Sequence, residues 1–248
     1  MIKIGRNIRD NYKYKDEVEF SRKNKFDLIQ VWYDKNGLEV NYEGNSKLEF
    51  IESCDFPIMI HAMLDINEFD EHAHKLVETA NLLNNKDLII HPICENEIID
   101  SNTAVKLSKE IKKVLKLCKE NGITLHLENN SKRMPIFSNT QDIKTILEKN
   151  PDLEILIDLA HVEDCSQIED IVKIRRPKIL HIADRRFSVT HEHLPIGDGE
   201  LDYEYIFKEI LYDFDGTIIL EIVQNDQSII DSKNRIVSLL EGRKINVI

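Results

Sequence analysis

The chain has 248 residues, of which 42% are hydrophobic and 31% are charged, and its formal net charge at pH 7 is −12. Only 8 Gly and 6 Pro occur, which excludes a linker-rich or disordered chain and leaves enough apolar residues for a full core. The negative charge disfavours nucleic acid as a partner, because phosphate binding needs Lys and Arg, although bound cations could reverse the sign within a cleft.

The sequence contains no apolar run long enough to span a membrane, and residues 1–5 do not begin a charged-then-apolar leader. The 4 cysteines are widely spaced and form no CxxC pair, which favours reduced core thiols over a disulfide framework. We therefore expect a cytoplasmic protein that handles small metabolites. The sequence does not decide whether the chain forms a homo-oligomer.

Segments with the patterns of strands and helices alternate along the whole chain. Short apolar runs predict strands at residues 1–5, 26–32, 57–61, 88–91, 123–128, 153–158, 178–182 and 217–221. The intervening segments predict helices at residues 15–23, 47–53, 67–83, 103–121, 139–149, 166–174, 203–211 and 227–241. Asn67 is the expected N-cap of the third helix, and Gly122 is the expected stop signal of the fourth.

Strands that alternate with helices in a chain of this length predict an α/β protein with one domain over residues 1–248, folded as a single (β/α)8 TIM barrel. The last three strands are nearly continuous Ile and Leu runs, as expected for parallel strands buried on both faces. An open doubly wound sheet is the competing fold. It is disfavoured because no GxGxxG turn follows the first strand, and polar residues end many strands rather than one switch point.

Polar residues gather where the later strands end, which is where the chemistry of β/α proteins usually lies. These strand ends and the loops after them supply histidines and carboxylates: His61, His91, Glu128, Asp158, His161, His181, His191, His193 and Glu221. A carboxylate buried there needs a cation or hydrogen bonds, and imidazole with carboxylate suits Zn, Mn, Fe or Co. The pattern favours a divalent metal centre at the barrel mouth over a set of structural ion pairs.

This set of residues resembles that of the xylose-isomerase-like TIM barrels. That superfamily joins sugar isomerases and epimerases with the type-IV apurinic/apyrimidinic endonucleases. The resemblance rests on the combined ligand set and on three phrases, LEN at 127–129, DLAH at 158–161 and HLPIGDG at 193–199. It covers roughly residues 61–221, which is most of the expected barrel.

In the endonuclease branch such residues hold three metal ions. The resemblance implies a first ion at His61, His91 and Glu128, a second at Glu128, Asp158, His181 and Glu221, and a third at His161 and His193. His191 stands where that branch has Asp, two residues before the position of His193. The third site would then consist of three histidines, a set that suits Zn.

In the isomerase and epimerase branch a smaller set holds one Mn, Co or Mg-like ion. The resemblance implies these ligands here: Glu128, Asp158, His181 and Glu221. Glu128 and Glu221 would also move a proton at the carbon beside the carbonyl of a metal-bound ketose, with His161 as a third catalytic residue. The expected cofactor is therefore a divalent ion, Zn, Mn, Co or Mg, in one to three copies.

Four further residues near the expected mouth could contact the substrate: Trp32, Asn129, Arg185 and Arg186. Each has an ordinary structural alternative. Trp32 could pack in the core, and Asn129 could shape a turn. The two arginines could clamp a phosphate or carboxylate, or pair with acidic residues of the rim.

We conclude from the sequence that the chain is a metal-dependent sugar or sugar-phosphate isomerase or epimerase with a small carbohydrate substrate. A multi-zinc phosphoesterase of the endonuclease type is the rival, favoured by the near-complete ligand set. Against it stand the charge of −12, the short loops after the first two strands, and the lack of a basic or aromatic wedge for bending a duplex. A barrel that binds a metabolite without turning it over stays open.

Overall fold

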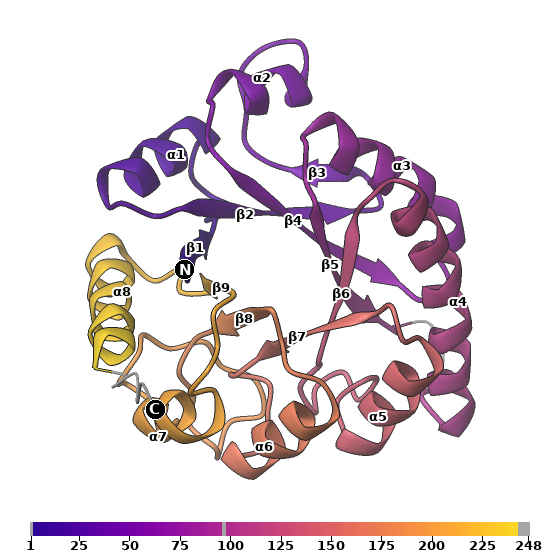
Figure 1. The fold of residues 1–248 in the computed structure, drawn as a ribbon. Helices are drawn as coiled ribbons and strands as arrows, with labels where there is room; N and C mark the ends of the chain where they lie inside the picture. The colour runs from indigo at the N-terminus through magenta and orange to yellow at the C-terminus, as the bar shows by residue number, and fades with distance from the viewer. Residues whose placement is uncertain (1, 96–97, 243–248) are drawn as a thin grey trace.

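The computed structural model describes residues 2–95 and 98–242 and contains a closed barrel of parallel strands surrounded by helices (Figure 1). The expected TIM barrel is confirmed. The strands are β1 (Lys3–Asn7), β2 (Leu28–Asp34), β3 (Gly37–Glu39), β4 (Ile58–Asp65), β5 (Asp87–Ile93), β6 (Thr124–Glu128), β7 (Glu154–Asp158), β8 (Ile179–Ile182) and β9 (Thr217–Leu220). Met1, included in the first predicted strand, lies outside the described residues.

The ring of strands runs β1-β9-β8-β7-β6-β5-β4-β2, and it closes because β1 also pairs with β2 in parallel. In that closing pair Gly5 lies opposite Leu28. The strand β3 was not predicted and lies outside the ring, where it pairs antiparallel with β2. A turn at Gly37, whose φ of 105° suits glycine, folds the chain back on itself there.

The helices are α1 (Tyr14–Lys23), α2 (Lys47–Ser53), α3 (Phe69–Leu82), α4 (Ser101–Glu120), α5 (Thr140–Lys149), α6 (Cys165–Ile174), α7 (Tyr203–Tyr205), the π-helical turn η1 (Ile206–Ile210) and α8 (Asp226–Glu241). Polar side chains begin several of them. Asn139, Asp164 and Asn225 each accept a hydrogen bond from the backbone N–H three residues later. Within the described segments no helix combines the length and the apolarity needed to cross a lipid bilayer.

The two predicted helix boundaries have different outcomes. Gly122, with a φ of 65°, follows the end of α4 as expected. The prediction for Asn67 is wrong, because α3 begins at Phe69 and Glu68 is its N-cap. The backbone and side-chain N–H groups of Asn67 donate instead to Asp65 Oδ1, at the end of β4.

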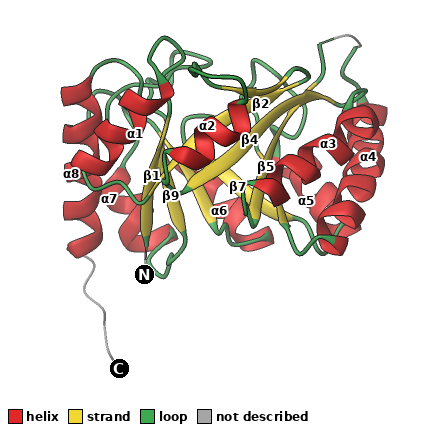
Figure 2. Ribbon diagram, turned by 90° about the horizontal axis from the view of Figure 1, so that it is seen from above, coloured by secondary structure: helices red, strands yellow, loops and turns green. Residues whose placement is uncertain are grey.

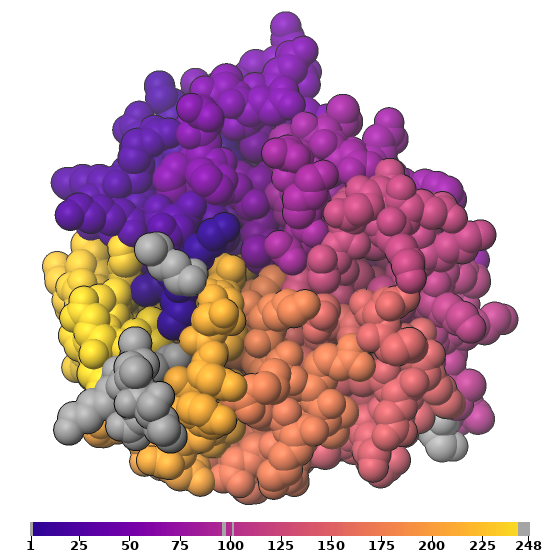
Figure 3. All heavy atoms as spheres, viewed as in Figure 1, coloured from indigo at the N-terminus to yellow at the C-terminus, as the bar shows by residue number. Residues whose placement is uncertain are grey.

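Two apolar layers hold the barrel together. The larger layer lies between the strands and the surrounding helices, and Figure 2 shows those helices flanking the strands while long loops gather at the end opposite the N-terminus. The smaller layer fills the barrel interior and consists of Leu28, Met59, Ile89, Leu156, Ile179 and Ile219. In Figure 3 the N-terminal (indigo) and C-terminal (yellow) segments adjoin, as the pairing of β1 with β9 requires.

Candidate metal centre

The alternation of side chains along each strand builds the site directly above the inner apolar layer. Successive residues of a strand point to opposite faces, so the residue two positions after an inward apolar one also points inward. Those following residues are all polar: Gln30, His61, His91, Asp158, His181 and Glu221. Glu128 holds the same place on β6, two residues after the buried His126. The sequence therefore places one ring of polar groups at the carboxyl end of the barrel.

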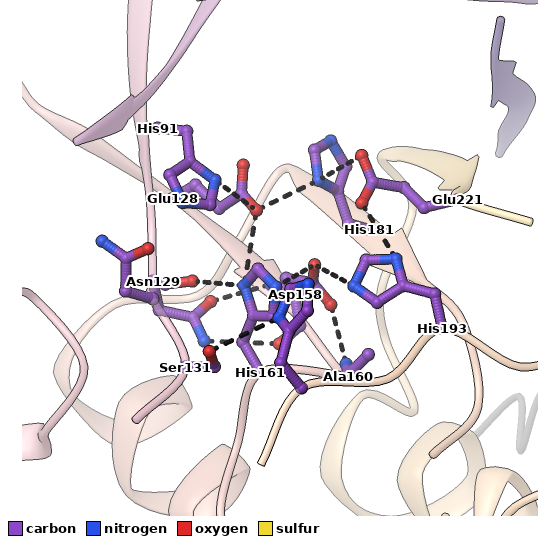
Figure 4. Close-up of polar contacts among 12 residues, drawn as sticks. His91, Glu128, Asn129, Ser131, Asp158, Ala160, His161, His181, His193 and Glu221 are labelled. Atoms are coloured by element: carbon purple, nitrogen blue, oxygen red, sulfur yellow. Dashed lines mark hydrogen bonds and ion pairs between the residues drawn. The ribbon is translucent and has the colours of Figure 1, made fainter. Parts of the chain in front are cut away.

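Glu128 is the centre of one half of this ring (Figure 4). Its Oε2 lies 2.7 Å from His61 Nε2, and its Oε1 lies 3.2 Å from His91 Nδ1. The same Oε1 is 3.5 Å from the Nδ1 atoms of both His161 and His181. One carboxylate thus faces four imidazoles that come from β4, β5, β8 and the turn after β7.

Glu221 and Asp158 define the other half of the ring (Figure 4). His181 Nδ1 lies 3.2 Å from Glu221 Oε1, and His193 Nδ1 lies 3.5 Å from Glu221 Oε2. Asp158 Oδ2 is 3.3 Å from His161 Nε2 and 3.8 Å from His193 Nε2. Each predicted ligand discussed so far therefore has a nitrogen or oxygen atom within 3.5 Å of another predicted ligand.

The remaining predicted ligand, His191, lies beside His161 and His193. The ring centroid of His161 lies 5.0 Å from that of His191 and 5.5 Å from that of His193. Ligand atoms of these three histidines lie within 4.8 Å of one another, which is close enough for a single ion. The structure brings together all nine sequence-predicted ligands, and we call them the candidate metal centre.

Several atoms of this centre are buried and, although some face one another closely, make no hydrogen bond of suitable distance and angle with any described residue. They are His61 Nε2, both carboxylate oxygens of Glu128, Asp158 Oδ2, His161 Nε2, His181 Nδ1 and His193 Nε2. Leaving one such atom unpaired costs about 1–3 kcal/mol, and more when it is charged. Converging nitrogen and carboxylate oxygen atoms are the donor set of Zn and related divalent ions. The residues present therefore fit a divalent cation.

The electrostatics of the centre point the same way. Burial opposes the charge of Glu128, yet the surrounding histidines, led by His91, hold the pKa of its carboxyl well below the ordinary value. Burial also opposes a charge on His181, yet Glu221 and Glu128 raise its pKa to about 9. Burial raises the pKa of Asp158 and lowers that of His161 to about 3. The carboxylates thus attract positive charge that His61 and His161, whose pKa values burial lowers, do not supply.

A cavity of about 1360 Å³ leads from this centre to the loops around β1 and β2. Its lining includes Glu128, His161, Glu221 and Trp32. The half-buried Trp32 ring lies over His61, with 4.5 Å between ring centroids. Trp32 therefore borders the cavity, and its contact with a substrate stays a prediction.

The other predicted substrate contacts have different partners. Asn129 Oδ1 accepts a hydrogen bond from the backbone N–H of Asp158 at 2.7 Å, so its amide joins β6 to β7. The buried Arg185 guanidinium donates to the backbone carbonyls of Ala160, Val162 and Val189. Arg186 pairs with Glu192 at the surface. A role for these three side chains in substrate binding stays a prediction.

Two residues of the site were missed from the sequence. Gln30 is fully buried in the polar ring, and its signal was a polar residue at an inward position of the apolar strand β2. Asp184 organises the loop that carries His191 and His193. Its carboxylate accepts hydrogen bonds from the backbone N–H groups of Arg185, Gly197 and Leu201. No pattern in that polar loop distinguished Asp184 from its neighbours.

Comparisons with known proteins agree with this architecture. A search of curated proteins returned no match. Among solved structures, a D-tagatose 3-epimerase-like protein has 20% identity and a TM-score of 0.74, covering 99% of this chain and 100% of that one. D-psicose 3-epimerase from Clostridium cellulolyticum H10 has 13% identity and a TM-score of 0.74, covering 96% and 99%.

A third similar structure is that of the IOLI protein with a bound zinc atom, at 15% identity and a TM-score of 0.74, covering 98% of this chain and 99% of that one. These likenesses concern the fold. The family model described as xylose isomerase-like TIM barrel matches residues 56–239, which include the whole candidate metal centre. The chain belongs to the xylose isomerase-like TIM barrel family.

Proposed function

We propose that this protein is a divalent-metal-dependent isomerase or epimerase that acts on a small carbohydrate. The observation that carries the proposal is the convergence of unpaired carboxylate and imidazole atoms at the inner end of a large cavity. The sugar epimerases among the similar structures support the substrate class. The zinc-containing IOLI structure supports a metal-dependent reaction.

Four residues of the candidate metal centre would hold the catalytic ion: Glu128, Asp158, His181 and Glu221. His181 Nδ1 faces the carboxylates of both Glu128 and Glu221 at hydrogen-bonding distances without donating to either. Zn, Mn, Co and Mg all accept ligands of this kind to different degrees. When bound, such an ion would polarise the carbonyl and the neighbouring hydroxyl group of a ketose.

The proton transfers belong to Glu128 and Glu221. These carboxylates come from opposite sides of His181, on β6 and directly after β9, and both line the cavity. A substrate carbon between them presents one face to each carboxylate. Removal of its proton by one carboxylate and return by the other inverts that carbon, whereas return to the neighbouring carbon moves the carbonyl.

His161 and Trp32 support these transfers. The low pKa of His161 keeps its ring uncharged, so its Nε2 can form a hydrogen bond with a substrate hydroxyl. The ring then does not take up the proton that Glu128 and Glu221 transfer. Trp32 offers an apolar face to the C–H groups of a sugar and keeps water from the carbon that reacts.

The rival function, phosphoester hydrolysis, is favoured by one observation. His161, His191 and His193 form a group that could hold an ion of its own, beside the group of His61, His91 and Glu128. Clustered ions activate water and stabilise a leaving oxygen, which is the chemistry of phosphodiesterases. The number of bound ions therefore separates the two functions.

The test combines metal content with proton exchange. Elemental analysis of the unchelated protein should give one divalent ion per chain, unchanged in His191→Ala. Proton NMR in D₂O should show loss of the signal from the C–H beside the carbonyl in at least one ketose or ketose phosphate of a panel. Glu128→Gln and Glu221→Gln should abolish this exchange, whereas Glu154→Gln, at the other end of β7, should retain it.

Three ions per chain, falling to two in His191→Ala, together with hydrolysis of a phosphodiester would replace the proposal by the rival. One ion per chain with no exchange in any ketose would favour a barrel that binds a metabolite without turnover.

A further inference from the structure

Gln30 is a fully buried amide that links three residues of the candidate metal centre. Its Nε2 donates to Glu221 Oε1 at 2.9 Å and lies 3.0 Å from His61 Nδ1. Its Oε1 lies 2.8 Å from His181 Nε2. These three contacts use both N–H groups and the carbonyl oxygen of the amide, so that no donor of this buried side chain is left over.

The orientation of the Gln30 amide is fixed by Glu221. An ionised carboxylate can only accept, so the NH₂ end of the amide has to face it. The second N–H of that NH₂ group then points at His61 Nδ1, and the carbonyl oxygen is left for His181. Exchange of the two ends would place the amide oxygen against the carboxylate oxygen of Glu221.

This orientation determines the tautomers of two histidines. His181 has to carry a proton on Nε2 to donate to Gln30, so Nδ1 is the ring nitrogen that is left to bind an ion. That Nδ1 is the atom directed at Glu128 and Glu221. His61 has to accept at Nδ1, and a neutral imidazole then carries its proton on Nε2. That Nε2 is the atom 2.7 Å from Glu128 Oε2.

We propose that Gln30 is a positioning residue that prepares His181 as a ligand through Nδ1 and keeps His61 out of the ligand set. An imidazole nitrogen that carries a proton cannot bind an ion, so the group of His61, His91 and Glu128 lacks a ligand while Gln30 is in place. Metal binding in this part of the centre is thereby restricted to the four residues that would hold the catalytic ion. This inference rests on the metal centre of the proposed function but not on the reaction.

A buried apolar residue would serve a merely structural role as well as Gln30 does. Leu28 fills the inward position one layer below on the same strand, and burying an amide stabilises nothing unless its hydrogen bonds are made. The partners of a metal-binding histidine typically change metal affinity 10–100-fold when they are removed. Gln30 should therefore affect the histidine tautomers and the metal affinity more than the stability.

The experiment uses the full chain labelled with ¹⁵N-histidine and treated with a chelator. Long-range ¹H–¹⁵N spectra report which ring nitrogen carries the proton, and His61→Phe and His181→Phe assign the two sets of signals. Zn affinity is then measured by competition with a chromogenic chelator for wild type, Gln30→Leu and Gln167→Leu. Gln167 is the matched control, because its buried amide also bonds at both ends, to Glu163 and Ser138, away from the centre.

In the chelated wild type we expect His61 to carry its proton on Nε2, and His181 to carry a proton on Nε2 whether or not its Nδ1 is also protonated. Gln30→Leu should populate the other tautomer of His61 and weaken Zn binding about 10–100-fold, whereas Gln167→Leu should change neither. A wild-type His61 with its proton on Nδ1 would overturn the inference without any variant. Unchanged tautomers and Zn affinity in Gln30→Leu would also overturn it. Absence of ketose proton exchange would instead count against the proposed reaction alone.

Discussion

Two clusters of buried charge lie in this barrel, and they differ in whether their own residues balance them. Between β1 and α1, Glu17 accepts a hydrogen bond from Arg6 at 2.6 Å. It also accepts hydrogen bonds from the backbone N–H and the guanidinium of Arg9, the shortest at 2.5 Å. Arg9 also pairs with Asp226 at the start of α8. In the candidate metal centre, by contrast, several carboxylate and imidazole atoms have no hydrogen-bond partner among the described residues.

The difference teaches how a structural ion cluster can be told from a binding site. Arginine carries a permanent charge and several donors, so the cluster around Glu17 is complete when the chain folds. A neutral histidine provides one nitrogen lone pair, and burial can remove the charge of its ring, as the pKa of about 3 for His161 shows. The first cluster thus stabilises the fold by itself, whereas a cation from solution would balance the second.

The largest effect should come from breaking the balanced cluster. Glu17→Gln leaves the buried Arg6 and the nearly buried Arg9 without their carboxylate, which typically costs about 3–5 kcal/mol. Urea unfolding monitored by circular dichroism should show this loss equally with and without a chelator. Glu19→Gln, at an exposed position of α1, is the control and should leave the unfolding midpoint unchanged.

The next effect tests the unbalanced cluster directly. Zn at 100 times its dissociation constant should raise the free energy of unfolding of the wild type by about 2.7 kcal/mol. Thermal unfolding with Zn and with a chelator measures this difference. The gain should persist in Glu17→Gln and disappear in Glu221→Gln. A gain of the same size in Glu221→Gln would mean that the ion binds elsewhere.

A smaller effect of opposite sign should separate the clusters further. In the chelated protein Asp158→Asn should raise the free energy of unfolding by about 1 kcal/mol, because it removes an unpaired charged atom whose burial is costly. Asn can keep the bond that Asp158 Oδ1 accepts from the N–H of Ala160. Urea unfolding should show the gain, while Zn should no longer stabilise this variant. A clear loss of stability would show that Asp158 is already balanced without an ion.

The smallest effect is a dependence on pH. Burial opposes the charge of Glu17, but Arg9 and Arg6 lower the pKa of its carboxyl below the ordinary 4.5. A lowered pKa stabilises the fold above the ordinary value, and this contribution is lost as the pH falls through the folded-state pKa. The stability difference between wild type and Glu17→Gln should therefore narrow below about pH 4.5. A difference that stays constant from pH 7 to pH 3 would contradict this assignment.

The sequence predicted the barrel and the gathering of the ligands because both depend on short-range patterns. Alternation along a strand determines which residues point inward, and the strand count determines that their ends meet. The contacts of Gln30 and Arg185 could not be predicted in this way. Gln30 contacts residues of β4, β8 and the end of β9, while Arg185 donates to backbone carbonyls of the loop after β7. These contacts depend on tertiary positions that no local pattern encodes.

The two-residue spacing between the inner apolar layer and the polar ring also limits how this protein can change. A one-residue shift in any of these strands would turn its apolar side chain out of the barrel interior and its polar side chain away from the mouth. The same shift would then remove both the apolar packing and the polar ring, so a change of register cannot alter one without the other. Variation that leads to new substrates is therefore expected in the loops around the cavity, above a barrel whose register stays constant.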